Sequence, residues 1–116
     1  MRRRHLLLFL PVLTATALLP TVLLPAWADD MPEVTLTFLG DRFEPAEVPV
    51  PADVKFSLRI VNKSTISMEF ESKALHREKL VPPGKEARVF IGPVKAGTYE
   101  FFDDFHPKIR GNLVAR

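Results

Sequence analysis

Alternation of apolar and polar side chains is the main pattern of the chain beyond residue 33. The clearest case is the segment VKFSLRI at 54–60, where every second side chain is apolar, as in a half-buried β-strand. The same two-residue period recurs in further short segments, at residues 34–38, 68–71, 78–81, 87–91, 98–103 and 111–115. About seven short strands at regular spacing predict an all-β Greek-key sandwich.

Two stretches between these segments predict something else. Pro45, Pro49 and Pro51 confine their stretch to an edge strand or an extended connection, because proline cannot donate to a β-ladder. Residues 72–80 contain the best helix signal, which amounts to one turn. The triplet GTY at 97–99 is typical of a tyrosine corner, in which the phenol ties one strand to a preceding turn.

The first 28 residues have the organisation of a secretory signal peptide. Arg2, Arg3 and Arg4 precede an almost wholly apolar run, and Ala26-Trp27-Ala28 has the small-x-small form of a cleavage site. We therefore expect a signal peptide at 1–28, an exported domain at 29–116 and a periplasmic location. Two alternatives stay open: an uncleaved anchor, because the apolar run approaches bilayer-spanning length, and twin-arginine export, because the arginines are adjacent.

Removal of the leader changes the charge of the protein. Without its three arginines the chain has 13 Lys and Arg against 14 Asp and Glu, a net charge of −1. No basic patch remains that would indicate nucleic-acid binding. The chain has no cysteine, which excludes thiolate catalysis and Cys-ligated zinc or copper.

The segment MEFES at 68–72 contains the first group of candidate ligands. If Phe70 faces the core, the strand period puts Met68 on the same side and Glu69 and Glu71 on the opposite side. Two carboxylates on alternate positions of a strand are about 7 Å apart. They can serve one cation only if they lean together or if a neighbouring strand contributes.

The second group follows the next aromatic segment. Asp103 continues the core-facing side of its strand at the point where a loop begins, and Asp104 and His106 follow directly. Carboxylates, a thioether and an imidazole together suit borderline or redox metals better than calcium. Each residue also has a simpler interpretation: Met68 as core packing, Glu69 and Glu71 as a solvated face that pairs with Lys73 or Arg88, the aspartates as acceptors for local amides, and His106 as a surface loop residue.

Hydrolytic active sites are not indicated. The chain has neither a G-x-S-x-G elbow nor an H-E-x-x-H helix, and an 88-residue sandwich has little room for a substrate cleft. The sequence also has no Gly-rich phosphate-binding loop. We expect no hydrolase activity.

Several short runs together resemble the EfeO-type cupredoxin-like domain family: MEFES at 68–72, REK at 77–79, PG at 83–84, IGP at 91–93, GTY at 97–99 and FFDDFH at 101–106. The resemblance implies a cupredoxin-like sandwich in which Met68 stands at the first histidine position of ordinary cupredoxins and Asp103 at their cysteine position. His106 is similar to the histidine of the following loop. A free-standing domain is similar to the FtrB-like periplasmic component of ferrous iron transporters.

This resemblance implies binding of copper and/or iron by acidic residues, with further candidates beside them. The implied metal ligands are Met68, Glu69, Glu71, Asp103, Asp104 and His106. Strand parity argues that these six do not all meet at one ion, so two neighbouring sites are an alternative. The expected partners are the metal ion, an inner-membrane iron permease and other periplasmic uptake components, without nucleic acid.

The leading hypothesis is a periplasmic metal-binding protein that assists iron uptake, with copper-assisted oxidation of Fe²⁺ as one route. Whether the protein is an enzyme in that sense is left open. One alternative is a copper carrier or buffer without a redox role. The other is a binding module for a non-metal ligand, in which the β-sandwich is only a scaffold.

Overall fold

The structure is a computed structural model that describes residues 11–12, 14–17 and 31–116. The expected cleavage site after Ala28 and most of the expected signal peptide lie outside the described residues, so both stay predictions. Within the described ranges, no helix is long and apolar enough to cross a membrane.

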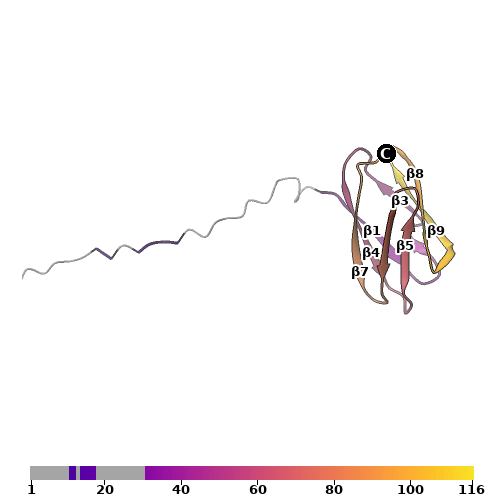
Figure 1. The fold of residues 1–116 in the computed structure, drawn as a ribbon, viewed down its shortest axis with the longest axis horizontal. Helices are drawn as coiled ribbons and strands as arrows, with labels where there is room; N and C mark the ends of the chain where they lie inside the picture. The colour runs from indigo at the N-terminus through magenta and orange to yellow at the C-terminus, as the bar shows by residue number, and fades with distance from the viewer. Residues whose placement is uncertain (1–10, 13, 18–30) are drawn as a thin grey trace, which may run out of the picture.

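Residues 33–115 form nine β-strands in two packed sheets (Figure 1). In chain order these are β1 (Glu33–Phe38), β2 (Phe43–Glu44), β3 (Glu47–Val50), β4 (Phe56–Asn62), β5 (Met68–Ser72), β6 (Arg77–Val81), β7 (Glu86–Ile91), β8 (Gly97–Asp103) and β9 (His106–Ala115). One sheet has the order β2-β1-β4-β7 and the other the order β3-β9-β8-β5-β6. The predicted all-β sandwich is confirmed.

The strand pattern differs from the sequence prediction in a few places. The prediction did not include β2 and β3. β2 ends directly before Pro45, and β3 lies within the proline-bearing stretch and at a sheet edge, as the prolines require. The single helical turn expected within residues 72–80 is wrong. His76 N–H donates to Lys73 C=O at 3.3 Å in a tight turn, and β6 begins at Arg77. β9 begins at His106 instead of Gly111, because its pairing with β8 continues to the hairpin turn.

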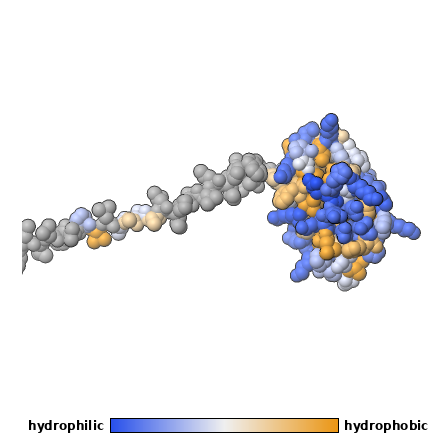
Figure 2. All heavy atoms as spheres, viewed as in Figure 1, coloured by the Kyte–Doolittle hydropathy of each residue, from blue (hydrophilic) through white to orange (hydrophobic). Residues whose placement is uncertain are grey.

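Aromatic and aliphatic side chains fill the space between the sheets. Phe43 and Phe101 meet edge to face with ring centroids 4.9 Å apart, and Phe70 lies 5.3 Å from Phe101. Met68 and Phe70 of β5 are both fully buried here, which confirms the predicted parity of that strand. The outward positions are mostly polar, and Figure 2 shows a surface dominated by hydrophilic residues with smaller hydrophobic patches.

Two local contacts fix β8 and β9 against the rest of the sandwich. Tyr99 donates its phenol hydrogen to Lys95 C=O at 2.8 Å, which confirms the predicted tyrosine corner. Gly111 lies where β9 passes over the Phe101 ring and the Ala46 carbonyl, and a Cβ at this position would collide with both. These contacts hold β8 to the turn before it and β9 to the residue that precedes β3.

β5 and β8 pair over a short distance only. Their register joins Phe70 with Asp103 and Glu71 with Phe102. One residue further on, Asp104 N–H donates to Glu69 C=O at 2.8 Å. This backbone bond brings the start of the β8–β9 turn next to the outward side chains of β5, where the candidate ligands lie.

Candidate metal centre

Asp103 is fully buried, and its carboxylate contacts three hydrogen-bonding groups. Its Oδ1 accepts hydrogen bonds from the N–H groups of Glu69 at 3.0 Å and Phe105 at 3.1 Å. Its Oδ2 lies 2.9 Å from Nδ1 of His106. A buried carboxylate with this many donors is stable without a metal, because its lone pairs are already used.

His106 is oriented by that contact. The imidazole is about half exposed, with 49% of its side chain accessible to solvent. A neutral ring that donates from Nδ1 to Asp103 has its acceptor lone pair on Nε2, which is the arrangement found in carboxylate-oriented histidine ligands. In that tautomer, Nε2 is the ring atom that can hold a cation.

Three other carboxylates gather on the outer face of the same sheet. Oxygen atoms of Glu69, Glu71 and Asp104 lie within 4.8 Å of one another. The two glutamates are alternate outward residues of β5, and the backbone bond from Asp104 to Glu69 brings the third carboxylate to them. The β8–β9 turn, which follows the neighbouring strand, thus supplies the third carboxylate that the spacing of Glu69 and Glu71 required.

Like charges crowd this cluster. Partial burial is the largest cause of a raised pKa of Glu71, because it removes water from the charged carboxylate. The negative charge of Asp104 and a hydrogen bond between the two side chains raise this pKa further. Glu78, directly opposite Glu71 on β6, adds to the increase, and only Lys73 acts in the other direction. A cation bound between these oxygens would replace repulsion by attraction.

The structure divides the six predicted ligands into three groups. Glu69, Glu71 and Asp104 share one outward cluster, whereas Asp103 and His106 form a separate pair at the end of β8. Met68 packs in the core and belongs to neither. The predicted parity argument against one common ion agrees with this separation, and metal binding itself stays a prediction.

Two charged residues differ from expectation. Arg88 does not pair with the β5 glutamates, because it lies in β7 of the other sheet, where its Nε is 3.2 Å from Glu33 Oε2 of β1. Glu78 was not singled out in the sequence, although the β5–β6 hairpin places it opposite Glu71. The sequence could have indicated this position only through a short turn at residues 73–76, since a hairpin with a turn of that length pairs position 71 with position 78.

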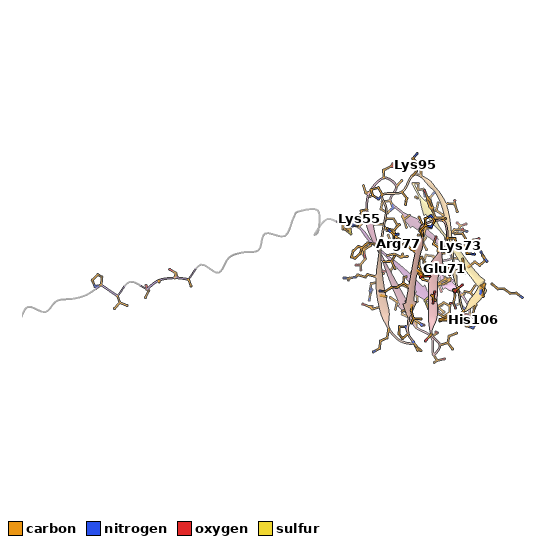
Figure 3. The ribbon with its side chains drawn as sticks, viewed as in Figure 1. Lys55, Glu71, Lys73, Arg77, Lys95 and His106 are labelled. Carbon is orange, nitrogen blue, oxygen red and sulfur yellow. The ribbon has the colours of Figure 1, made fainter. Side chains whose placement is uncertain are left out.

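Figure 3 shows Glu71 and Lys73 close together, with His106 nearer one end of the sandwich.

Residues 6–115 match the cupredoxin-like domain family, and the chain belongs to this family. A protein of Rickettsia prowazekii (strain Madrid E), uncharacterized protein RP394, is 42% identical over 78 residues, which are 67% of this chain and 62% of that protein. This chain therefore spans about three-fifths of the length of that relative.

Solved structures with the same fold include two copper-protein types. Amicyanin from Paracoccus versutus is 18% identical, with a TM-score of 0.59, over 80% of this chain and 85% of that one. Auracyanin A from Chloroflexus aurantiacus, described as a blue copper protein, is 17% identical, with a TM-score of 0.61, over 72% of this chain and 98% of that one. At these identities the likeness shows the cupredoxin-like fold.

The residues present do not fit a thiolate-ligated copper centre. The chain has no cysteine, both oxygens of Asp103 already have partners, and Met68 is enclosed by the core. The outward cluster does fit a cation that prefers oxygen ligands, because three carboxylates reach one position there. Any copper held by this protein would therefore have a ligand set without sulfur from a thiolate.

Proposed function

We propose that this protein is an exported iron-binding protein that carries iron as cargo and holds it with Glu69, Glu71 and Asp104. The observation that carries the proposal is the convergence of these three carboxylates, at a position where partial burial and then the charge of Asp104 raise the pKa of Glu71. Crowded carboxylates with a perturbed pKa are more common at functional sites than on ordinary surfaces.

The chemistry of the cluster suits reversible binding of a hard cation. Carboxylate oxygens favour hard or borderline ions over soft ones such as Cu(I). Glu69 and Glu71 are half-buried and Asp104 is exposed, so solvent and other ligands can reach the ion. An accessible position with three protein ligands is suited to loading and release, whereas a structural ion is usually enclosed.

The setting of the proposal comes from the N-terminal pattern and from the EfeO-type resemblance. Arg2–Arg4, the apolar run and Ala26–Ala28 favour export to the periplasm. The motifs at residues 68–72 and 101–106 favour a role in iron uptake beside an inner-membrane iron permease. Cargo delivery to that permease needs binding only, so oxidation of Fe²⁺ is not a required part of it.

Isothermal titration of the exported protein tests the site. Fe²⁺ under anaerobic conditions, Cu²⁺ and Ca²⁺ are compared at pH 7 for the wild type and for Glu71→Gln combined with Asp104→Asn. We expect Fe²⁺ to bind to the wild type and the double variant to bind at least about tenfold more weakly, because two of three carboxylate ligands are lost. Glu47→Gln is the matched control, since Glu47 is an exposed glutamate on β3 at the far edge of the same sheet. Equal, millimolar Fe²⁺ binding by all three proteins contradicts the proposal.

A copper carrier without redox activity is the second candidate, favoured by the exposed imidazole of His106 and by the copper proteins among structural neighbours. His106→Ala then lowers Cu²⁺ affinity and leaves Fe²⁺ affinity unchanged. Anaerobic mixing of the Cu²⁺-loaded protein with Fe²⁺ separates carrier from oxidase, because only an oxidase transfers one electron from Fe²⁺ to Cu²⁺ and so forms Fe³⁺ and Cu⁺. Absence of binding to any of these metals favours the module for a non-metal ligand.

A further inference from the structure

We propose that the cleft beside the carboxylate cluster binds a small di- or tricarboxylate that travels with the metal ion. This inference rests on the proposed function, because the metal is one partner of the complex. It adds a second ligand, of opposite charge, in a cleft that shares only Asp104 with the proposed metal site.

The cleft has a volume of about 360 Å³ and opens on the outer face of β8 and β9. Phe102 lies in it next to Asp104, and Phe102 pairs with Glu71 in the β-ladder. The cleft therefore begins where the carboxylate cluster ends. A molecule inside it can reach an ion held by Asp104.

Two cationic side chains cover the aromatic floor of this cleft. The Lys73 ammonium is 5.8 Å from the centroid of Phe102, and the Arg110 guanidinium carbon is 5.0 Å from the same centroid. Phe102 exposes only 8% of its surface beneath them. Ammonium and guanidinium groups above an apolar floor are a favourable environment for carboxylates, because they donate charge-assisted hydrogen bonds.

The charges of the cleft couple anion binding to metal binding. Two acidic residues, Glu100 and Asp104, line the cleft together with Lys73 and Arg110. Glu100 forms an ion pair with Arg110. These two positive and two negative groups leave the empty cleft with no net attraction for an anion. With Glu69 and Glu71 included, two positive and four negative side chains surround the ion position, a net charge of −2. A divalent ion cancels this charge and offers open coordination positions, so the anion is bound only together with the metal. By linkage, the anion strengthens metal binding by the same factor.

Coordination chemistry points to a polycarboxylate rather than a simple anion. Three protein carboxylates leave coordination positions of an iron ion open to solvent. A molecule with two or more carboxylates can fill such positions with one group and contact Lys73 or Arg110 with another. A monovalent anion such as acetate cannot do both.

Equilibrium dialysis with radiolabelled citrate as the probe tests this inference on the exported protein. Chambers contain citrate alone, Fe²⁺ alone, or both under anaerobic conditions, and both metal and label are counted. We expect the wild type to retain citrate only when Fe²⁺ is present. Lys73→Gln should retain citrate about three- to tenfold more weakly, since one charge-assisted contact is lost. The same variant should bind Fe²⁺ alone slightly more tightly, because a positive charge next to Glu71 is removed.

Lys55→Gln is the matched control. Lys55 stands 5.6 Å over the Phe90 ring on the other sheet, so it has the same type of cation–aromatic contact without a carboxylate cluster. Its citrate retention should equal that of the wild type. Citrate that removes Fe²⁺ without being retained overturns the inference, as does equal retention without Fe²⁺. Equal retention of inorganic phosphate in place of citrate overturns the polycarboxylate assignment. Failure to bind Fe²⁺ alone overturns the proposed function instead.

Discussion

Asp103 and Glu71 lie on neighbouring strands at adjacent levels of one sheet, yet their carboxylates face opposite environments. Asp103 is fully buried and its two oxygens have three donor groups around them. Glu71 is half-buried, and its partial loss of hydration and then the neighbouring carboxylates raise its pKa. A charge that the fold has already satisfied is a structural element, whereas a charge that the fold leaves in repulsion has capacity for a ligand.

This difference also separates the roles of the two faces. The inward Asp103 ties β5 to the β8–β9 turn, since it accepts from the backbone of both. The outward cluster adds no comparable support, and its repulsion opposes folding. Loss of an inward residue should therefore affect stability, and loss of an outward residue should affect metal binding.

The largest expected effect is the loss of stability in Asp103→Ala. The N–H groups of Glu69 and Phe105 lose their acceptor in a part-buried position, and an unsatisfied buried donor costs about 1–3 kcal/mol. We expect the free energy of unfolding to fall by about 3 kcal/mol in urea denaturation. His106→Ala leaves both amide bonds intact and should lose distinctly less. Equal losses in the two variants would show that the amides do not matter.

The next effect concerns metal affinity and pH. Protons compete with the cation for the carboxylates, and Glu71 takes up its proton at a higher pH than an ordinary glutamate because its pKa is raised. Fe²⁺ affinity should therefore fall at least about tenfold between pH 7 and pH 4, and the fall should begin above the usual glutamate range. Titration at several pH values measures it. A flat profile would exclude carboxylate ligation.

The smallest expected effect is a pair of opposite changes in the stability of the metal-free protein. A raised pKa means that the folded state favours protonated Glu71, a stabilisation that is present at low pH and is lost as pH rises through the raised value. Glu71→Gln should therefore raise the melting temperature slightly at pH 7, with no gain at pH 3. Glu100→Gln should lower it, because the hydrogen bond from Arg110 and its positive charge lower the pKa of Glu100, and that stabilisation disappears only as pH falls through the lowered value. The same sign in both variants would contradict the comparison.

Much of the architecture could be predicted from the sequence because the two-residue period determines which face a side chain takes. It placed Met68 and Asp103 inward and Glu69 and Glu71 outward, as the structure has them. It also identified the tyrosine corner from one short triplet. The short strands β2 and β3 carry too few alternating residues for the same argument.

The division of the candidate site could not be predicted, because it depends on contacts between strands. The backbone bond that brings Asp104 to Glu69 joins residues distant in sequence, and no local pattern encodes it. The position of Glu78 opposite Glu71 needs the register of a hairpin that was expected to contain a helical turn. Pairing geometry, and not composition, decides which carboxylates meet.

The bond between Asp104 N–H and Glu69 C=O has a consequence for engineering. It involves main-chain atoms only, so the spacing of the three outward positions does not depend on which side chains they carry. Histidines at 69 or 71 could retune the preference for different ions while the sandwich and its buried aspartate stay as they are. The protein thus offers a fixed frame with an exchangeable chelating surface.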